Sequence, residues 1–226
     1  MNESLFFLHT LVTFFFLGVA LFLGKETLVA FVATCWLFAN FFVSKQIGLF
    51  GFEVTASDVY VIGAMIGMSV IQEFFGKKTA YKTMWSSFFI MGVSVVMSFF
   101  HLWYTPSAAD TMQPLFEKIL HPLPRLMIAS FIAYFIVAKL QIALFSYLHR
   151  FQRISFAVRS FLTTALMIFL DSFLFVAIGL WGMFPSLGDI LLLGIVIKLL
   201  LTFSMSLFLS LAKHAYSFKK LPDESI

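Results

Sequence analysis

Residues Leu5–Leu23 read LFFLHTLVTFFFLGVALFL, a run that contains no charged side chain. About 20 apolar residues in a helix cross the hydrocarbon layer of a membrane. A backbone in lipid must satisfy its own hydrogen bonds, so such a run predicts a helix rather than a loop. The preceding residues, MNES, lack the basic charge of a cleavable signal peptide, and no small-residue cleavage site follows. We therefore expect this run to remain as a first transmembrane helix.

Composition extends this prediction to the whole chain. Of its 226 residues, 61% are hydrophobic and 12% are charged, with a mean hydropathy of +0.99. Soluble domains carry about 25% charged residues. The fold class predicted is all-α: a polytopic integral membrane helical bundle of about seven, alternatively six, transmembrane helices, in a single domain covering residues 1–226. The further spans are expected at Thr27–Val43, Asp58–Ile71, Met84–Trp103, Leu126–Phe145, Ser160–Leu180 and Asp189–Ser210.

The third span is short and rich in glycine, so a re-entrant element is the alternative there. The longest connection, Tyr104–Arg125, contains four prolines, which disfavour a continuous helix, although Met112–Leu120 could form a short one. The glycines Gly63 and Gly67 form a small-xxx-small pair, and we expect them to allow close helix packing rather than to form a binding site.

Basic residues divide unequally between the two sides of a seven-span bundle. One side carries ten of the fifteen Lys and Arg residues and the other carries three, while Lys139 and Lys198 fall inside spans. Because Lys and Arg are retained in the cytoplasm, the N-terminus is predicted outside and the C-terminus inside. The ten are Lys25, Lys77, Lys78, Lys82, Arg150, Arg153, Arg159, Lys213, Lys219 and Lys220, and the three are Lys45, Lys118 and Arg125.

Polar residues at membrane depth are the candidates for function, since a charge there costs about 2.5–3.5 kcal/mol on insertion scales. Asp171 and Lys198 lie near the middle of the last two spans, and consecutive helices are usually neighbours, so an Asp171–Lys198 pair is expected. A purely structural ion pair is the alternative. Trp36 and Asn40 share a helix face and suit a planar, hydrogen-bonding ligand. A helix–helix hydrogen bond of Asn40 is the competing interpretation.

Other classes of function have little support in the residues. Cys35 is alone, the five histidines show no metal-ligand spacing, and no P-loop motif occurs. Neither a nucleophile–base pair nor a metal cluster is visible, so we predict no enzyme activity, no metal and no cofactor. The net charge of +4 reflects membrane orientation and not nucleic-acid binding. A non-transporting membrane protein is the rival class.

Two stretches resemble a known family. Residues 39–82 read ANFFVSKQIGLFGFEVTASDVYVIGAMIGMSVIQEFFGKKTAYK, and residues 158–173 read VRSFLTTALMIFLDSF. Together with Arg125 and the ASFIAY that follows at residues 129–134, they resemble the queuosine precursor transporter family, also called the vitamin uptake transporter family. Where relatives carry acidic residues or Gln, this chain has Ser69, Gln141 and Ile168, which leaves preQ0, preQ1 and queuine all open as substrates.

The resemblance implies import of a purine-like 7-deazaguanine base across a bacterial inner membrane for tRNA modification. Uptake of another heterocycle or vitamin is the alternative. The expected partners are this small molecule and the lipid bilayer, and a homo-oligomer is compatible with the sequence. Substrate-binding roles are predicted for Asp171, Asn40, Glu73, Lys198, Trp36, Tyr60, Gln141 and Thr164, and motif or gating roles for Lys45, Asp58, Gly76, Arg125 and Arg159.

Overall fold

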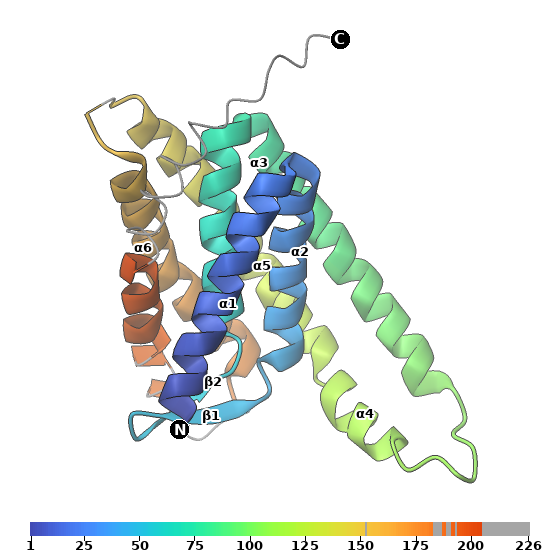
Figure 1. The fold of residues 1–226 in the computed structure, drawn as a ribbon. Coiled ribbons are helices and arrows are strands. Elements are labelled where there is room, and N and C mark those ends of the chain that lie inside the picture. Colours follow the sequence, from blue (N-terminus) through green and yellow to red (C-terminus); the bar gives the residue numbers. More distant parts are fainter. Residues whose placement is uncertain (152, 183–186, 189–190, 193, 205–226) are drawn as a thin grey trace, which may run out of the picture.

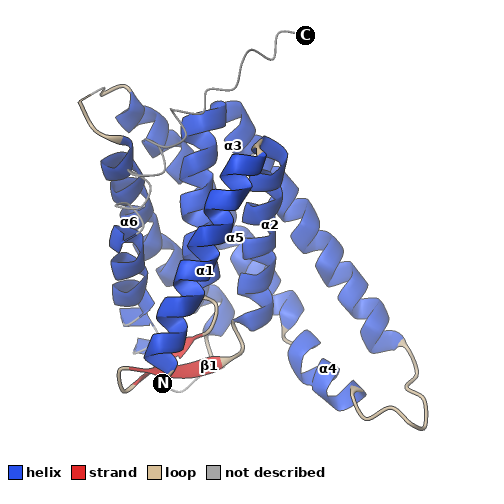
Figure 2. Ribbon diagram, in the orientation of Figure 1, coloured by secondary structure: helices blue, strands red, loops and turns tan. Residues whose placement is uncertain are grey.

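The computed structural model describes residues 1–151, 153–182, 187–188, 191–192 and 194–204. Long helices dominate these ranges, as Figures 1 and 2 show. The helices are α1 (Asn2–Leu23), α2 (Lys25–Phe42), α3 (Asp58–Trp103), α4 (Gln113–Leu120), α5 (Leu123–His149) and α6 (Phe156–Phe175), which continues into the π-helical segment η1 (Val176–Leu180). A further helix covers Gly194–Ser204.

Within the described residues, five helices are long and apolar enough to cross a membrane. At 46 residues, α3 is about twice as long as one crossing needs. Gly76 interrupts it with φ 81° and ψ 169°, a conformation that a residue with a side chain rarely adopts, and the chain reverses direction there (Figure 1). Counting the two halves of α3 separately gives six spanning segments. A helical membrane bundle is therefore confirmed.

The spans predicted from sequence fall on these segments. Asp58–Ile71 lies in a regular helix rather than a re-entrant element. The proline-rich connection contains the short helix α4, close to the expected Met112–Leu120. Of the predicted span Asp189–Ser210, the helix Gly194–Ser204 lies in the described residues, and several of the other positions lie outside them.

One element was not predicted: a β-hairpin in an otherwise helical chain. Strands β1 (Gln46–Leu49) and β2 (Phe52–Thr55) pair antiparallel around Phe50 and Gly51, whose φ angles are both positive. The N-terminus of α1 holds this hairpin, because Asn2 donates to the Gly48 carbonyl and Glu3 accepts from the Phe50 N–H. We call the end of the bundle that carries this hairpin the hairpin end, and it lies at the bottom of Figure 1.

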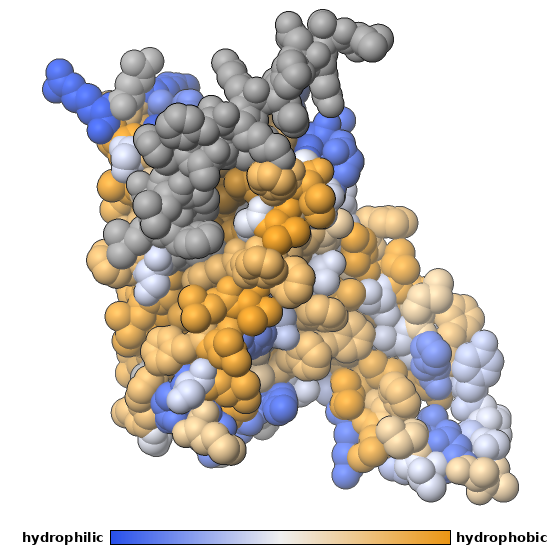
Figure 3. Space-filling model, in the orientation of Figure 1, coloured by the Kyte–Doolittle hydropathy of each residue, from blue (hydrophilic) through white to orange (hydrophobic). Residues whose placement is uncertain are grey.

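The opposite end, called the Gly76 end, holds the α1–α2 junction, the reversal in α3 and the connection from α5 to α6 (Figure 1). Between the two ends the surface in Figure 3 is mostly hydrophobic. Large side chains such as Phe15, Phe89 and Phe173 are exposed there. An apolar surface of this kind matches the hydrocarbon of a bilayer. These features describe a multi-pass membrane protein.

Helix α2 packs along the first half of α3 in the core of the bundle. Leu28 and Val32 of α2, and Ile62 of α3, are fully buried in one hydrophobic core cluster. Gly63 and Gly67 of α3 face the side chains of α1 and α2 at short distances, so the predicted close packing at this pair is what the structure has. This contact fixes the position of α2 relative to the start of α3, where polar residues gather.

Candidate functional site

A cavity lies between α2, the corner from β2 to α3, α5, the end of α6 and the helix Gly194–Ser204. Its lining comes from the last turns of α2 and α6, the first turn of α3 and an early turn of α5, which places the cavity toward the hairpin end. The lining residues are Trp36, Ala39, Asn40, Val43, Thr55, Ser57, Asp58, Val61, Ser130, Asp171, Ser172, Phe175, Val176, Leu180, Leu191 and Lys198.

Helix α2 contributes an aromatic and an amide side chain to the cavity. Trp36 and Asn40 are four residues apart and therefore lie on one face of the helix. The Trp36 ring packs on Tyr134 of α5, with 4.1 Å between ring centroids and 30° between planes. The Asn40 amide donates to the Trp36 carbonyl at 2.9 Å, while its Oδ1 is buried without a hydrogen-bond partner among the described residues. Asn40 thus offers an acceptor to a ligand.

The buried cation of the cavity is held by two residues. Lys198 Nζ lies 3.2 Å from Asp58 Oδ1 and 3.1 Å from Ser172 Oγ. The ion pair expected between Lys198 and Asp171 is therefore wrong, because Asp58 of α3 takes that place. Asp58 is the first residue of α3 and comes directly after the hairpin, which brings it to the cavity from a distant part of the sequence.

Asp171 lines the same cavity from α6 and is 6% exposed. It forms no hydrogen bond or ion pair with any residue that the structure describes, although its carboxylate lies near enough to Lys198 and Asp58 to interact electrostatically. A carboxylate accepts hydrogen bonds through two oxygens. Asp171 and Asn40 Oδ1 therefore present acceptors to the cavity, and a molecule rich in N–H donors would satisfy them.

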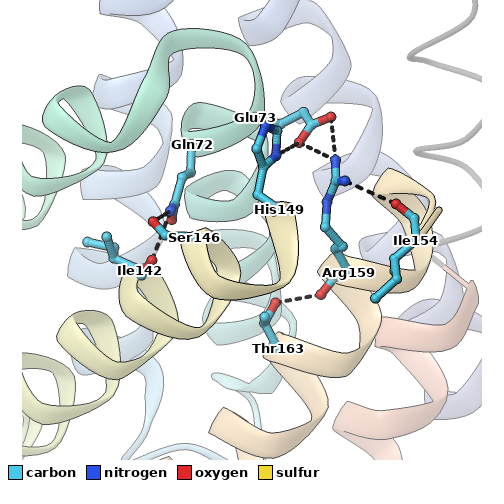
Figure 4. Close-up of polar contacts among 8 residues, drawn as sticks. All are labelled: Gln72, Glu73, Ile142, Ser146, His149, Ile154, Arg159 and Thr163. Carbon is cyan, nitrogen blue, oxygen red and sulfur yellow. Dashed lines mark hydrogen bonds and ion pairs between the residues drawn. The ribbon is translucent and has the colours of Figure 1, made fainter. Parts of the chain in front are cut away.

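A second polar cluster lies near the Gly76 end (Figure 4). Arg159 Nη2 donates to Glu73 Oε1 at 2.8 Å and to Glu73 Oε2 at 2.7 Å, and both side chains are almost fully buried. Arg159 also donates to the Ile154 carbonyl, and His149 Nδ1 lies 3.4 Å from Glu73 Oε2. This cluster joins α3, α5 and α6 three residues before the reversal at Gly76.

Two glutamine side chains cross between α3 and α5 in opposite directions. Gln72 Nε2 donates to the Ile142 carbonyl at 2.9 Å, and Gln141 Nε2 donates to the Met65 carbonyl at 2.8 Å. Gln72 also reaches Ser146 and Gln141 also reaches Ser69. These contacts fasten the two helices together between the cavity and the Gly76 end.

The predicted site residues thus separate into two groups. The cavity brings together Trp36, Asn40, Asp58, Asp171 and Lys198. Outside its lining lie Glu73, Tyr60, Gln141, Thr164, Lys45, Gly76, Arg125 and Arg159.

Their positions follow from local contacts. Tyr60 packs against His9, Phe38 and Phe42 at a neighbouring groove that Lys45 also lines. Thr164 is fully buried in α6. Arg125 donates to the Trp181 carbonyl at the hairpin end.

Several cavity residues were not singled out from the sequence. Ser172 follows Asp171 directly, so its place beside the cavity could have been read from that neighbour. Thr55, Ser57 and Ser130 lie in the stretches that carry the family resemblance but were given no role of their own; the Thr55 and Ser57 hydroxyls lie 2.9 Å apart. Among the described residues, no group of three His, Cys, Asp or Glu side chains could hold a metal ion.

Comparisons with known proteins match most of the chain. Residues 55–212 match the family model described as "Putative vitamin uptake transporter". The chain is also similar to the "Probable queuosine precursor transporter" of Bacillus subtilis (strain 168), with 27% identity over 201 residues that cover 88% of this chain and 86% of that protein. No solved structure matches. The matched region contains Asp58, Asp171 and Lys198, which carry the charges of the cavity.

Proposed function

Because the chain belongs to the vitamin uptake transporter family, we propose that it imports queuosine precursors, the 7-deazaguanine bases preQ0, preQ1 or queuine, into a bacterial cytoplasm for tRNA modification. The similarity to a protein named as a queuosine precursor transporter supports this choice of substrate. As a carrier, the protein needs a polar site inside the bundle and no catalytic group. The cavity between α2, α3, α5 and α6 is that site.

The observation that carries the proposal is the Asp171 carboxylate, which lines the cavity and has no hydrogen-bond partner among the described residues. A 7-deazaguanine base presents a ring N–H and an exocyclic amine side by side, and one carboxylate accepts both hydrogen bonds. The base carbonyl on the same ring needs a donor, and Lys198 lies in the same cavity. The flat face of the base fits against an aromatic side chain, and Trp36 lines the cavity. Asp171, Lys198 and Trp36 together match the chemistry of the base.

Transport also requires the site to open to each side in turn. The cavity lies toward the hairpin end, while the Glu73–Arg159 pair and the crossing glutamines lie between it and the Gly76 end. We assign Glu73, Arg159 and Gly76 to the inner gate for this reason, rather than to contact with the base. The hairpin, Lys45 and Arg125 belong to the outer end.

The orientation follows from the distribution of basic residues. Lys25, Lys77 and Arg150 lie at the Gly76 end, with most of the other loop Lys and Arg residues of the sequence expected on that side. Lys and Arg are enriched in cytoplasmic loops. The Gly76 end therefore faces the cytoplasm, the hairpin end faces outward, and the membrane is the bacterial inner membrane.

Uptake in cells tests the proposal. The host makes no queuosine and has no carrier of its own, and queuosine in tRNA is measured after preQ0, preQ1 or queuine is supplied at low concentration. We expect at least one base to restore the modification only when this protein is present. Asp171→Asn places an amide donor opposite the donors of the base, so uptake should fall about 10- to 100-fold, the worth of hydrogen bonds to a charged group.

Two controls make this result specific. Asp171→Asn should accumulate in the membrane, because Lys198 keeps its partner Asp58. Asp110→Asn makes the same substitution at an exposed loop position and should transport normally. If no base restores queuosine while the protein is abundant, uptake of another planar heterocycle, in keeping with the vitamin transporter family, replaces this proposal.

A further inference from the structure

The charges of the described residues that line the cavity do not balance. Two carboxylates, Asp58 and Asp171, face it together with one ammonium, Lys198. With all three groups ionised, the formal sum is two negative charges and one positive charge, which leaves −1. These are the ionisable side chains among the described lining residues.

The surplus negative charge belongs to Asp171. Lys198 is engaged by Asp58 and Ser172, at 3.2 and 3.1 Å. The basic side chain of α6, Arg159, lies about three turns from Asp171 and is bound to Glu73. Arg125, at the start of α5, donates to the Trp181 carbonyl. None of the described basic residues is therefore paired with Asp171.

A buried charge without a counter-charge is unfavourable in a membrane protein, and a cationic ligand would supply the missing positive charge. Asn40 Oδ1 adds a buried acceptor without a partner among the described residues, and the Ser130 hydroxyl lines the same cavity. A protonated amine has three N–H donors and one positive charge, which satisfies both requirements.

We propose that the cavity selects a 7-deazaguanine base that carries a protonated amine over a base of the same ring that is neutral. This inference rests on the proposed function. The ring binds Asp171 through its N–H donors, and the amine of the side chain donates to Asn40 Oδ1 and balances the surplus charge. Among the queuosine precursors, preQ1 carries a primary amine of this kind and queuine a secondary one, whereas preQ0 carries a neutral nitrile on the same ring.

The test compares uptake of preQ1 and preQ0 by cells that express the whole chain, with each base quantified in cell extracts by mass spectrometry. We expect preQ1 to be preferred about 10-fold or more in kcat/KM for uptake, the size expected when one unit charge interacts across a partly hydrated cavity. Equal uptake of the two bases, or preference for preQ0, overturns the inference while the proposed function stands. Uptake of neither base overturns the inference, whereas the proposed function falls only if queuine is not taken up either.

Two variants change the cavity charge without touching Asp171 or Asn40. Asp58→Asn leaves Lys198 to balance Asp171, so the sum becomes zero and the preference for preQ1 should fall toward 1. The double variant Asp58→Asn, Lys198→Met removes both members of the ion pair and returns the formal charge of the cavity to −1. It should restore the preference for preQ1 over preQ0, even if the rate of uptake of both bases is lower. A ratio that is unchanged in Asp58→Asn overturns the assignment of the surplus charge. The wild-type ratio decides the inference even if a variant fails to accumulate.

Discussion

Gly67 provides a quantitative test of how α2 and α3 are held together. A Cβ atom placed on Gly67 would lie 2.6 Å from Val32 Cγ2 and 3.6 Å from Leu17 Cδ1. Val32 is fully buried in the hydrophobic core cluster, so its methyl group can move only by displacing other core side chains. Gly67→Ala therefore forces α2 and α3 apart or moves Val32 out of its rotamer. Overpacking of this kind costs about 1–3 kcal/mol.

Helix propensity acts in the opposite direction. Replacing a helical glycine by alanine favours the helix by about 1 kcal/mol. Gly92→Ala isolates this gain, because Gly92 lies in the second half of the same α3 and its added Cβ would meet no atom within 4 Å. The two variants should consequently differ by about 1–3 kcal/mol in free energy of unfolding, with Gly67→Ala the less stable.

Thermal unfolding of the purified protein in detergent measures the difference. For a chain of this size, 1 kcal/mol corresponds to about 2–4 °C in Tm, so Gly67→Ala should melt about 2–12 °C below Gly92→Ala. Val32→Ala removes the methyl group that the new Cβ meets. The double variant should be more stable than the sum of the two single changes predicts, by about 1 kcal/mol or more. Equal Tm values for Gly67→Ala and Gly92→Ala would refute the close approach of α2 and α3.

Two further predictions concern the ends of the bundle. Glu73→Gln removes the carboxylate that binds the buried Arg159 guanidinium. Since breaking a buried ion pair costs about 3–5 kcal/mol, Tm should fall by about 6–20 °C. The control is Glu117→Gln, the same substitution at an exposed position, which should leave Tm unchanged. An unchanged Tm of Glu73→Gln would show that the pair does not hold the Gly76 end. The orientation is tested with the double variant Asp110→Cys, Cys35→Ala, whose new cysteine should react with a membrane-impermeant thiol reagent added to intact cells. Reaction only after the cells are permeabilised would show that this loop faces the cytoplasm, opposite to the prediction.

The apolar runs predicted the helices well because hydrophobic length alone decides whether a helix crosses a membrane. The hairpin gave no comparable signal. Its two-residue turn has positive φ at both Phe50 and Gly51, and the turn of this type favours Asn-Gly or Asp-Gly rather than Phe-Gly. Its strands are four residues each, shorter than the apolar runs on either side.

Several residues of the cavity were predicted from the sequence, but the ion-pair partner of Lys198 was not. Trp36 and Asn40 share a helix face in any regular helix, so their spacing sufficed. The partner of Lys198 depended on which helices meet in three dimensions. Adjacency along the chain favoured Asp171, whereas the hairpin brings Asp58 to Lys198 from 140 positions earlier in the sequence. Glu73 likewise pairs with a residue on α6, a contact that local sequence does not encode.

The crossing amides of Gln72 and Gln141 determine which parts of the bundle can move. Separating α3 from α5 would leave two amides and two main-chain carbonyls without partners in a region that contains little water. We therefore expect the first half of α3 and α5 to move together as one unit during transport. Because α2 is itself packed closely against α3, we expect opening of the cavity to come from the end of α6 and η1, which line another of its walls.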